Sequence, residues 1–95
     1  MKYFARSADK NESLKRERGV SFEDVISQIE RGNLIATLEH PNQRRYSGQR
    51  IYVVGIGGYA YLVPFVESET EVFLKTVIPS RKATNTYLRQ KEDHG

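Results

Sequence analysis

Two β-rich segments, residues 50–56 and 60–67, flank the dipeptide Gly57-Gly58. Glycine adopts positive φ angles without steric cost, and such a dipeptide between two alternating segments predicts a β-hairpin with a two-residue turn. Large side chains occupy alternate positions of both segments, namely Tyr52, Val54 and Ile56 in the first and Tyr59, Tyr61, Val63 and Phe65 in the second. Because successive side chains of a strand point to opposite faces, each series should share one face of an antiparallel sheet.

Two helices are predicted before this hairpin. Residues 9–18 form a basic segment that ends at Gly19, where glycine accommodates the left-handed conformation that follows many helices. Ser21 and Asp24 then have the spacing of a capping box, in which each side chain accepts a hydrogen bond from the other residue's backbone N–H. Apolar residues recur at helical spacing up to a terminating Gly32, namely Phe22, Val25, Ile26 and Ile29. The second helix is therefore amphipathic.

The remaining segments complete an α+β fold. They are a short β element at Tyr3-Phe4, a strand over 34–38, a polar loop over 41–49, a turn over 68–70, a strand over 71–78 and a basic helix over 80–91. Pro64 cannot donate to a strand ladder, which favours an edge or a bulge in the second strand of the hairpin. We expect two N-terminal helices, a four-stranded antiparallel sheet and a C-terminal helix.

Length and composition favour a single domain spanning residues 1–95. The chain is 38% hydrophobic and 28% charged, and no apolar run approaches the roughly 20 residues of a membrane span. It has no cysteine and only two histidines, which predicts neither a disulfide framework nor a structural metal site. The N-terminus lacks the apolar core of a signal peptide. We expect a cytoplasmic protein that uses no metal and no cofactor and has no membrane partner.

The positive charge of the chain is clustered. The net charge is +3, and the cations form an early group, a middle group and a late group: Lys10, Lys15, Arg16 and Arg18, then Arg44, Arg45 and Arg50, then Lys75, Arg81, Lys82, Arg89 and Lys91. If folding gathers these groups, they form a positive face suited to a phosphate backbone. If folding scatters them, they only maintain solubility.

The segment from Val72 to Thr84 carries the most specific chemistry. An apolar run ends at Pro79, Ser80 is a suitable helix N-cap, and Arg81 and Lys82 follow at once. The dipole of a helix start favours anions and disfavours cations, so two cations there are consistent with a phosphate that completes the site. The alternative is a solvated helix start, since lysine and arginine are common on surfaces.

Two parts of the chain resemble the BrnT family of small bacterial toxins, whose fold is similar to that of the RelE ribonucleases. The first comprises Phe4, Lys10-Asn11 and Gly19-Val20-Ser21-Phe22-Glu23-Asp24, and the second is Ile78-Pro79-Ser80-Arg81-Lys82-Ala83-Thr84. The order and length of the elements fit the family over nearly the whole chain. The resemblance implies a toxin of a type II toxin–antitoxin pair, held by a small antitoxin that is typically a ribbon-helix-helix DNA-binding protein.

The chain departs from the family pattern at four places. Arg6-Ser7 stands where the family usually has Trp-Asp, and Arg18 stands where it often has histidine. Thr76 aligns with a basic residue of the family, and Thr86-Tyr87 with a glutamate of its last helix. These departures bear on whether the activity of the family is retained.

A metal-independent endoribonuclease of this kind positions a 2′-hydroxyl for in-line attack and stabilises the charge that develops on the phosphate. Arg81 is the first candidate, because a guanidinium matches phosphate geometry with two hydrogen bonds. Lys82 and Lys75 are candidates as point charges, and Arg50 could reach the same face. His40 is the candidate for proton transfer, although a histidine at a strand end is more often structural.

The remaining candidates are expected to bind RNA without taking part in catalysis; they are Arg44, Arg45, Tyr46, Arg18 and Arg89. Tyr46 could also act as a base. Tyr87 lies one and a half turns beyond Arg81, where it could contribute to the same site or simply pack. Three hypotheses follow: a ribonuclease toxin that cleaves RNA and is inhibited by an antitoxin, a module that binds RNA or an acidic protein without cleavage, and a co-repressor that holds an antitoxin. The Ser80-Arg81-Lys82 segment favours the first, and the departures favour the second.

Overall fold

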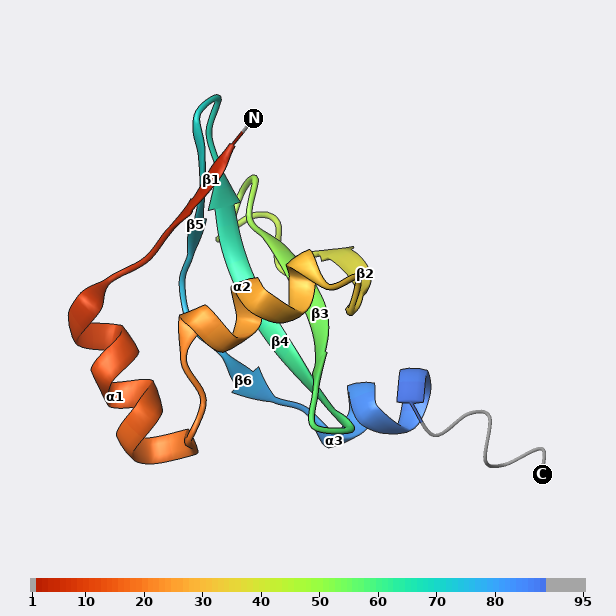
Figure 1. Cartoon of the computed structure of the whole chain (residues 1–95). Helices are drawn as coiled ribbons and strands as arrows, with labels where there is room; N and C mark the ends of the chain where they lie inside the picture. Colours follow the sequence, from red (N-terminus) through yellow and green to blue (C-terminus); the bar gives the residue numbers. More distant parts are fainter. Residues whose placement is uncertain (1, 89–95) are drawn as a thin grey trace.

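The computed structural model describes residues 2–88, which form a mixed β-sheet with helices on both faces (Figure 1). The strands are β1 (Tyr3–Ala5), β2 (Leu34–Glu39), β3 (Arg50–Ile56), β4 (Tyr59–Glu67), β5 (Glu71–Leu74) and β6 (Ile78–Pro79). Their order is β1-β5-β4-β3-β2, and β6 pairs with β4 beyond the end of β5. β1 runs parallel to β5, whereas the other pairs are antiparallel. The α+β class is confirmed, but a purely antiparallel sheet of four strands is wrong.

The first helix ends, and the second begins, at the residues that the sequence predicts. α1 (Ala8–Arg18) is followed by Gly19 at φ 68°, and α2 (Phe22–Glu30) begins after Ser21. The Ser21 hydroxyl accepts a hydrogen bond from the Asp24 backbone N–H at 3.1 Å, and the Asp24 carboxylate accepts one from the Ser21 N–H at 2.9 Å. The capping box therefore forms as predicted.

The C-terminal helix is shorter and less regular than predicted. It consists of α3 (Arg81–Ala83) and the π-helical turn η1 (Thr84–Leu88), and these two parts together are called the C-terminal helix below. Ser80 is its N-cap, since the Ser80 hydroxyl accepts a hydrogen bond from the Ala83 N–H at 3.0 Å. The predicted continuation to residue 91 lies outside the described residues.

The two faces of the sheet are covered differently. Side chains from α1 and α2 pack on one face, here called the covered face, with a core that includes Leu14, Phe22, Val25, Val54, Val63 and Phe65. Tyr52 stacks on Phe65 there, with 3.9 Å between the ring centroids. The other face, here called the open face, carries a smaller core of Val53, Ala60 and Ala83 beneath the C-terminal helix. The alternation predicted for the hairpin strands is confirmed.

The predicted strand over 71–78 is interrupted. β5 pairs with residues 65–67 of β4 and β6 with Tyr61 and Leu62, so that Pro64 lies opposite the interruption. The backbone N–H of Lys75 donates to the carbonyl of Pro64 at 2.8 Å. In an antiparallel strand the N–H and C=O of one residue point the same way, so the missing N–H of Pro64 faces this gap. β4 is therefore an interior strand, so the first alternative, an edge, is wrong. The pairing register shifts by one residue between Phe65–Leu74 and Leu62–Ile78, which agrees with the second alternative, a bulge.

Within residues 2–88, no helix has the length and apolar content required to cross a membrane.

Candidate functional site

A set of hydrogen bonds fixes the start of the C-terminal helix on β4. The Ser80 N–H donates to the carbonyl of Ala60 at 3.0 Å, and the Ala60 N–H donates to the hydroxyl of Thr84 at 2.8 Å. The Thr84 hydroxyl in turn donates to the carbonyl of Ser80 at 2.8 Å. Thr84 is only 2% exposed, so water does not replace these bonds. The backbone that carries Arg81 and Lys82 is therefore held in one place on the sheet.

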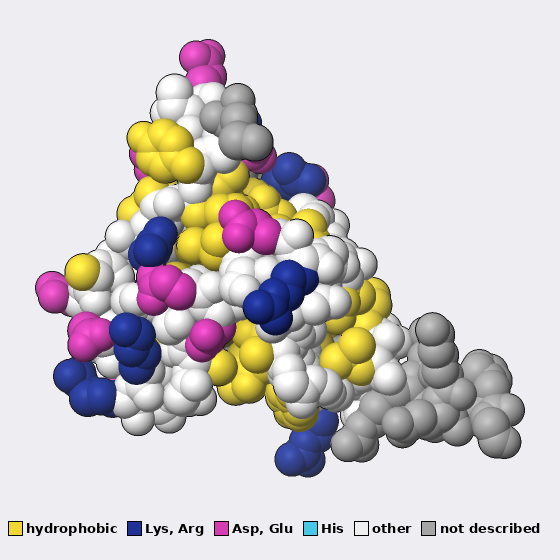
Figure 2. All heavy atoms as spheres, viewed as in Figure 1, with side chains coloured by type: hydrophobic (Ala, Val, Ile, Leu, Met, Phe, Trp, Pro, Cys, Tyr) yellow, Lys and Arg dark blue, Asp and Glu magenta, His cyan; other side chains and the backbone are white. Residues whose placement is uncertain are grey.

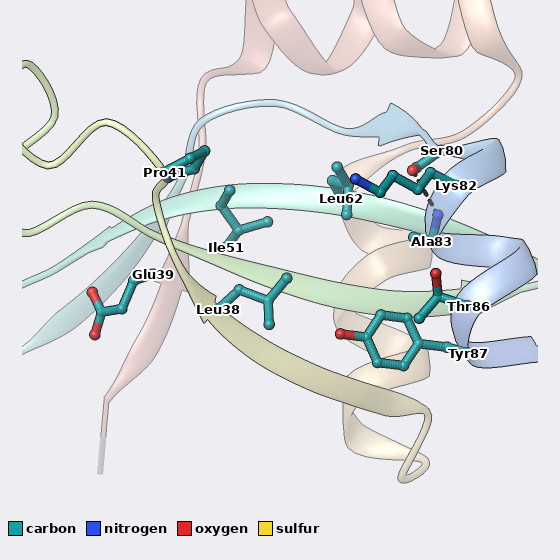
Figure 3. Close-up of a pocket in the computed structure, with 10 residues that line it drawn as sticks. All are labelled: Leu38, Glu39, Pro41, Ile51, Leu62, Ser80, Lys82, Ala83, Thr86 and Tyr87. Atoms are coloured by element: carbon teal, nitrogen blue, oxygen red, sulfur yellow. Dashed lines mark hydrogen bonds between the residues drawn. The ribbon is translucent and has the colours of Figure 1, made fainter.

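A groove of about 590 Å³ lies between this helix and strands β2, β3 and β4 on the open face. Its floor is apolar and consists mainly of Leu38, Ile51 and Leu62 (Figure 3). Lys82 and Tyr87 extend over it from the C-terminal helix, the ammonium group from one side and the phenol from the other. Glu39 lines the groove at the β2 end. The apolar floor suits a planar group, and Lys82 and Tyr87 make the side next to the C-terminal helix the one that favours a negatively charged ligand.

Arg81 points to a different hollow. It lines a smaller depression of about 290 Å³ together with Tyr59, Thr84 and Asn85. Neither Arg81 nor Lys82 has a carboxylate within ion-pair distance in the described part of the chain. α3 has only three residues, and the N–H groups of Ala83 and Thr84 already bond to Ser80. The predicted phosphate site therefore depends on the two side chains, which lie on either side of the helix start.

Lys75 shares the open face with Lys82. Its ammonium group lies 5.8 Å from the ring centroid of Phe73, which points away from the core residues Val72 and Leu74 on either side of it in β5. Lys75 is exposed, directly after β5 ends. It can therefore contact a long ligand that follows the open face beyond the groove.

Arg50 lies on the covered face. Its guanidinium carbon is 5.8 Å from the ring centroid of Phe65, and the guanidinium is 3.6 Å from the carboxylate of Glu67. Glu67 also binds Lys2 at 2.6 Å, and that hydrogen bond, assisted by Arg50, lowers the pKa of the Glu67 carboxyl. The prediction that Arg50 reaches the same face as Arg81 and Lys82 is therefore corrected.

His40 organises the loop that follows β2. Its ring lies 4.3 Å from the ring of Tyr46, and its Nδ1 accepts a hydrogen bond from the backbone N–H of Asn42 at 3.0 Å. Arg45 lies 5.6 Å from the centroid of the same tyrosine. These contacts give His40 a structural role in the loop. Pro41 lines the groove, so the segment that carries Arg44 and Arg45 begins at one end of it.

Arg18 connects the first helix to the segment that precedes the site. Its guanidinium donates a hydrogen bond to the backbone carbonyl of Val77. A residue predicted to bind RNA thus stabilises the approach to Ser80. Arg89 lies outside the described residues.

The sequence did not reveal the groove itself. The sequence predicts that Leu38, Ile51 and Leu62 lie in strands, but only the position of the C-terminal helix shows that they form an accessible floor. Tyr87 was a secondary candidate and is a rim residue in the structure. Among the described residues, no three histidine, aspartate or glutamate side chains cluster closely enough to hold a metal ion.

Comparisons of the chain with protein-family models, with curated proteins and with solved structures find no match.

Proposed function

We propose that this chain is a metal-independent endoribonuclease toxin of a type II toxin–antitoxin pair, and that single-stranded RNA binds along its open face. The observation that carries the proposal is the pair Arg81-Lys82, which is anchored to β4 and has no ion-pair partner among residues 2–88. Cations held without counter-charges favour a polyanionic ligand.

The groove accounts for the choice of a single strand. A splayed base can lie on the apolar floor and against the ring of Tyr87, which is 37% exposed. The phosphates on either side of that base then fall near Lys82 and Arg81, because both residues flank the same helix start. Lys75 extends this contact along the open face.

The chemistry follows from these positions. The 2′-hydroxyl of the bound nucleotide gives its proton to a water molecule and its oxygen attacks the adjacent phosphorus. The bond from phosphorus to the 5′-oxygen breaks as a 2′,3′-cyclic phosphate forms, and the 5′-oxygen takes a proton from the Tyr87 hydroxyl, which water then reprotonates. Lys82, at the groove, stabilises the negative charge that develops on the reacting phosphate, which is often the largest catalytic contribution. Arg81, in the adjoining hollow, holds the neighbouring phosphate and so keeps the reacting groups in line. The Tyr87 hydroxyl is the rim group available for proton transfer in the groove, in place of His40.

The first test is expression in bacteria without any partner gene. Wild-type protein should arrest growth, and Arg81→Ala should relieve the arrest at equal soluble expression. Arg16→Ala is the matched control, because Arg16 is an exposed cation in the last turn of α1, on the far side of the sheet. Normal growth with abundant soluble wild-type protein contradicts a toxin.

Purified protein should cleave single-stranded RNA in the presence of EDTA and leave 2′,3′-cyclic phosphate ends. Arg81→Ala and Lys82→Ala should each reduce the rate by at least about tenfold, corresponding to roughly 1.4 kcal/mol of transition-state stabilisation.

A second candidate function is binding of RNA or an antitoxin without cleavage. It is favoured by the positions of His40 and Arg50, which are engaged in the loop and on the covered face. RNA binding that depends on Lys82, together with intact RNA after prolonged incubation, would select this function.

A further inference from the structure

The outer side of β2 is an open sheet edge. β2 is the last strand in the sheet order, and none of the other described strands pairs with its outer side (Figure 1). The His40 N–H donates to the carbonyl of Gln49 in the same register that pairs Leu38 with Ile51. Hydrogen-bonded and non-bonded pairs alternate along an antiparallel ladder, so the backbone groups of Leu38 face β3. The N–H and C=O groups of Thr37 and Glu39 therefore point outward.

The side chains of this edge differ on the two faces. Leu38 lies on the groove side and is 38% exposed, so its side chain is accessible to a partner. Thr37 and Glu39 point to the opposite side, because strand side chains alternate. An exposed edge with outward donors and an accessible leucine is a template for another strand.

This edge is complementary to itself. When two β2 strands are placed antiparallel with a twofold axis at Leu38, Thr37 of each copy faces Glu39 of the other. The outward backbone groups of these residues then form four hydrogen bonds, and the two Leu38 side chains meet as a non-hydrogen-bonded pair. The alternative register centred on Glu39 would instead place two carboxylates against each other. An interface with twofold symmetry requires this kind of self-complementarity.

We propose that two copies of the chain associate through β2, with the twofold axis at Leu38, and form one continuous sheet. Leu38 of the edge strand lines each groove, so the association brings the two grooves together across the pair of leucines, with a Lys82 and a Tyr87 from each copy. This association is independent of the ribonuclease proposal.

The interface is small. The ladder between β2 and β3 is irregular between Leu34 and Ala36, which limits regular pairing of the edge to about residues 36–40. Most of the stabilisation therefore comes from Leu38 and the four hydrogen bonds. The dissociation constant is expected to be on the order of 1–100 µM, as for other small interfaces.

Sedimentation equilibrium of the full chain without RNA tests the association. Wild-type protein should convert from monomer to dimer over this concentration range. Thr37→Pro removes one outward N–H without touching the β3 ladder and should leave the protein monomeric, whereas Thr37→Val keeps that N–H and should still dimerise. A wild-type protein that is monomeric at millimolar concentration overturns the proposal, as does a dimer that persists in Thr37→Pro.

Cysteine cross-linking tests the register and does not depend on how well Thr37→Pro folds. The chain has no cysteine, so an introduced pair is the only source of a disulfide. Leu38→Cys should form a covalent dimer on mild oxidation, because the Cβ atoms of a directly opposed non-hydrogen-bonded pair are about 4.5–5.5 Å apart. Thr37→Cys is the control and should cross-link more slowly. Faster cross-linking of Thr37→Cys than of Leu38→Cys contradicts the proposed axis. The absence of cross-linking in both variants contradicts it as well.

Discussion

The two faces of one sheet use similar residues for opposite purposes. On the side that carries α1 and α2, acidic and basic groups are interspersed (Figure 2) and ion pairs link Arg6 to Glu23 and Arg50 to Glu67. On the open face, Lys75 and Lys82 have no ion-pair partner among residues 2–88. Lys10 and Arg16 of α1 also have none among these residues, but they do not flank a groove.

The apolar residues show the same contrast. Phe22 and Phe65 are 0% and 1% exposed on the covered face, whereas Leu38 and Tyr87 on the open face are 38% and 37% exposed. Stability is thus concentrated on one face, and groups suited to binding are left on the other. The predictions below test this division, beginning with the largest expected effect.

Truncation of the covered core should cause the largest loss of stability. Phe22→Ala removes a fully buried aromatic ring and should lower the free energy of unfolding by about 3–5 kcal/mol, since the transfer free energy is lost and a cavity remains. Urea denaturation measures the effect.

Tyr87→Ala is the matched truncation on the open face. It should change the free energy of unfolding by less than about 1 kcal/mol, because much of the ring already contacts water. The same variant should weaken RNA binding by about 1–3 kcal/mol through loss of base stacking. Similar losses of stability in both variants would show that the faces are not divided in this way.

The anchor of the C-terminal helix should produce an intermediate effect. Thr84→Val keeps the volume of the side chain but removes the hydroxyl, so the buried N–H of Ala60 loses its partner. The expected cost is about 1–3 kcal/mol in the free energy of unfolding.

Thr86→Val is the control, because Thr86 is exposed on the same helical turn. It should leave the unfolding curve almost unchanged. Thr84→Val should also reduce RNA affinity, since the backbone that carries Arg81 and Lys82 is no longer fixed to β4. Because Thr86 itself lines the groove, the two variants are compared in stability alone. Equal unfolding curves would show that the Thr84 hydroxyl does not anchor the helix.

Features that depend on neighbouring residues could be predicted from the sequence. The turn at Gly57-Gly58 and the capping box of Ser21 and Asp24 are determined within a few residues, and both appear in the structure. The sequence also predicts which face of the sheet the Arg50 side chain occupies, because alternation along the strand places it on the same face as Tyr52. That signal was present in the sequence and was not used.

Features that depend on distant segments could not be predicted in this way. The interruption after β5 arises where Pro64 of β4 meets Lys75, and the parallel pairing of β1 with β5 joins residues 3–5 to residues 71–73. The groove exists only because Thr84 fixes the C-terminal helix at Ala60. Periodicity and capping rules contain no information on such contacts.

The salt dependence of RNA binding should separate the cations of the two faces. Each phosphate contact contributes roughly −0.7 to the log–log slope of affinity against salt for single strands. Arg81→Gln and Lys82→Gln should therefore each make the slope shallower by about 0.7. Arg16→Gln should leave it unchanged, because Arg16 lies on α1. A filter-binding titration with a short single-stranded RNA gives these slopes, and equal slopes for all proteins would assign Arg81 and Lys82 another role.

The smallest expected effect is on the pH dependence of the free energy of unfolding, through Glu23 on the covered face. The side-chain amide of Asn11 donates to the carboxylate of Glu23 at 2.8 Å, and Arg6 pairs with the same carboxylate at 2.8 Å. The hydrogen bond from Asn11 is the largest cause that lowers the pKa of Glu23 below its ordinary value of 4.5; partial burial opposes it and Arg6 adds to it. A carboxyl with a lowered pKa in the folded state stabilises the fold above its ordinary pKa, and this stabilisation is lost as the pH falls through the folded-state value.

Glu23→Gln cannot titrate, so it should remove this part of the pH dependence. Between about pH 6 and pH 3, wild-type protein should lose more of its free energy of unfolding than Glu23→Gln does. Glu17→Gln is the control, because Glu17 has no ion pair within residues 2–88, and it should keep the wild-type loss. If Glu23→Gln and wild type lose stability in parallel, the contacts of Asn11 and Arg6 do not stabilise the charged carboxylate. The ion pair of Arg6 with Glu23 would then contribute nothing measurable to the stability of the covered face.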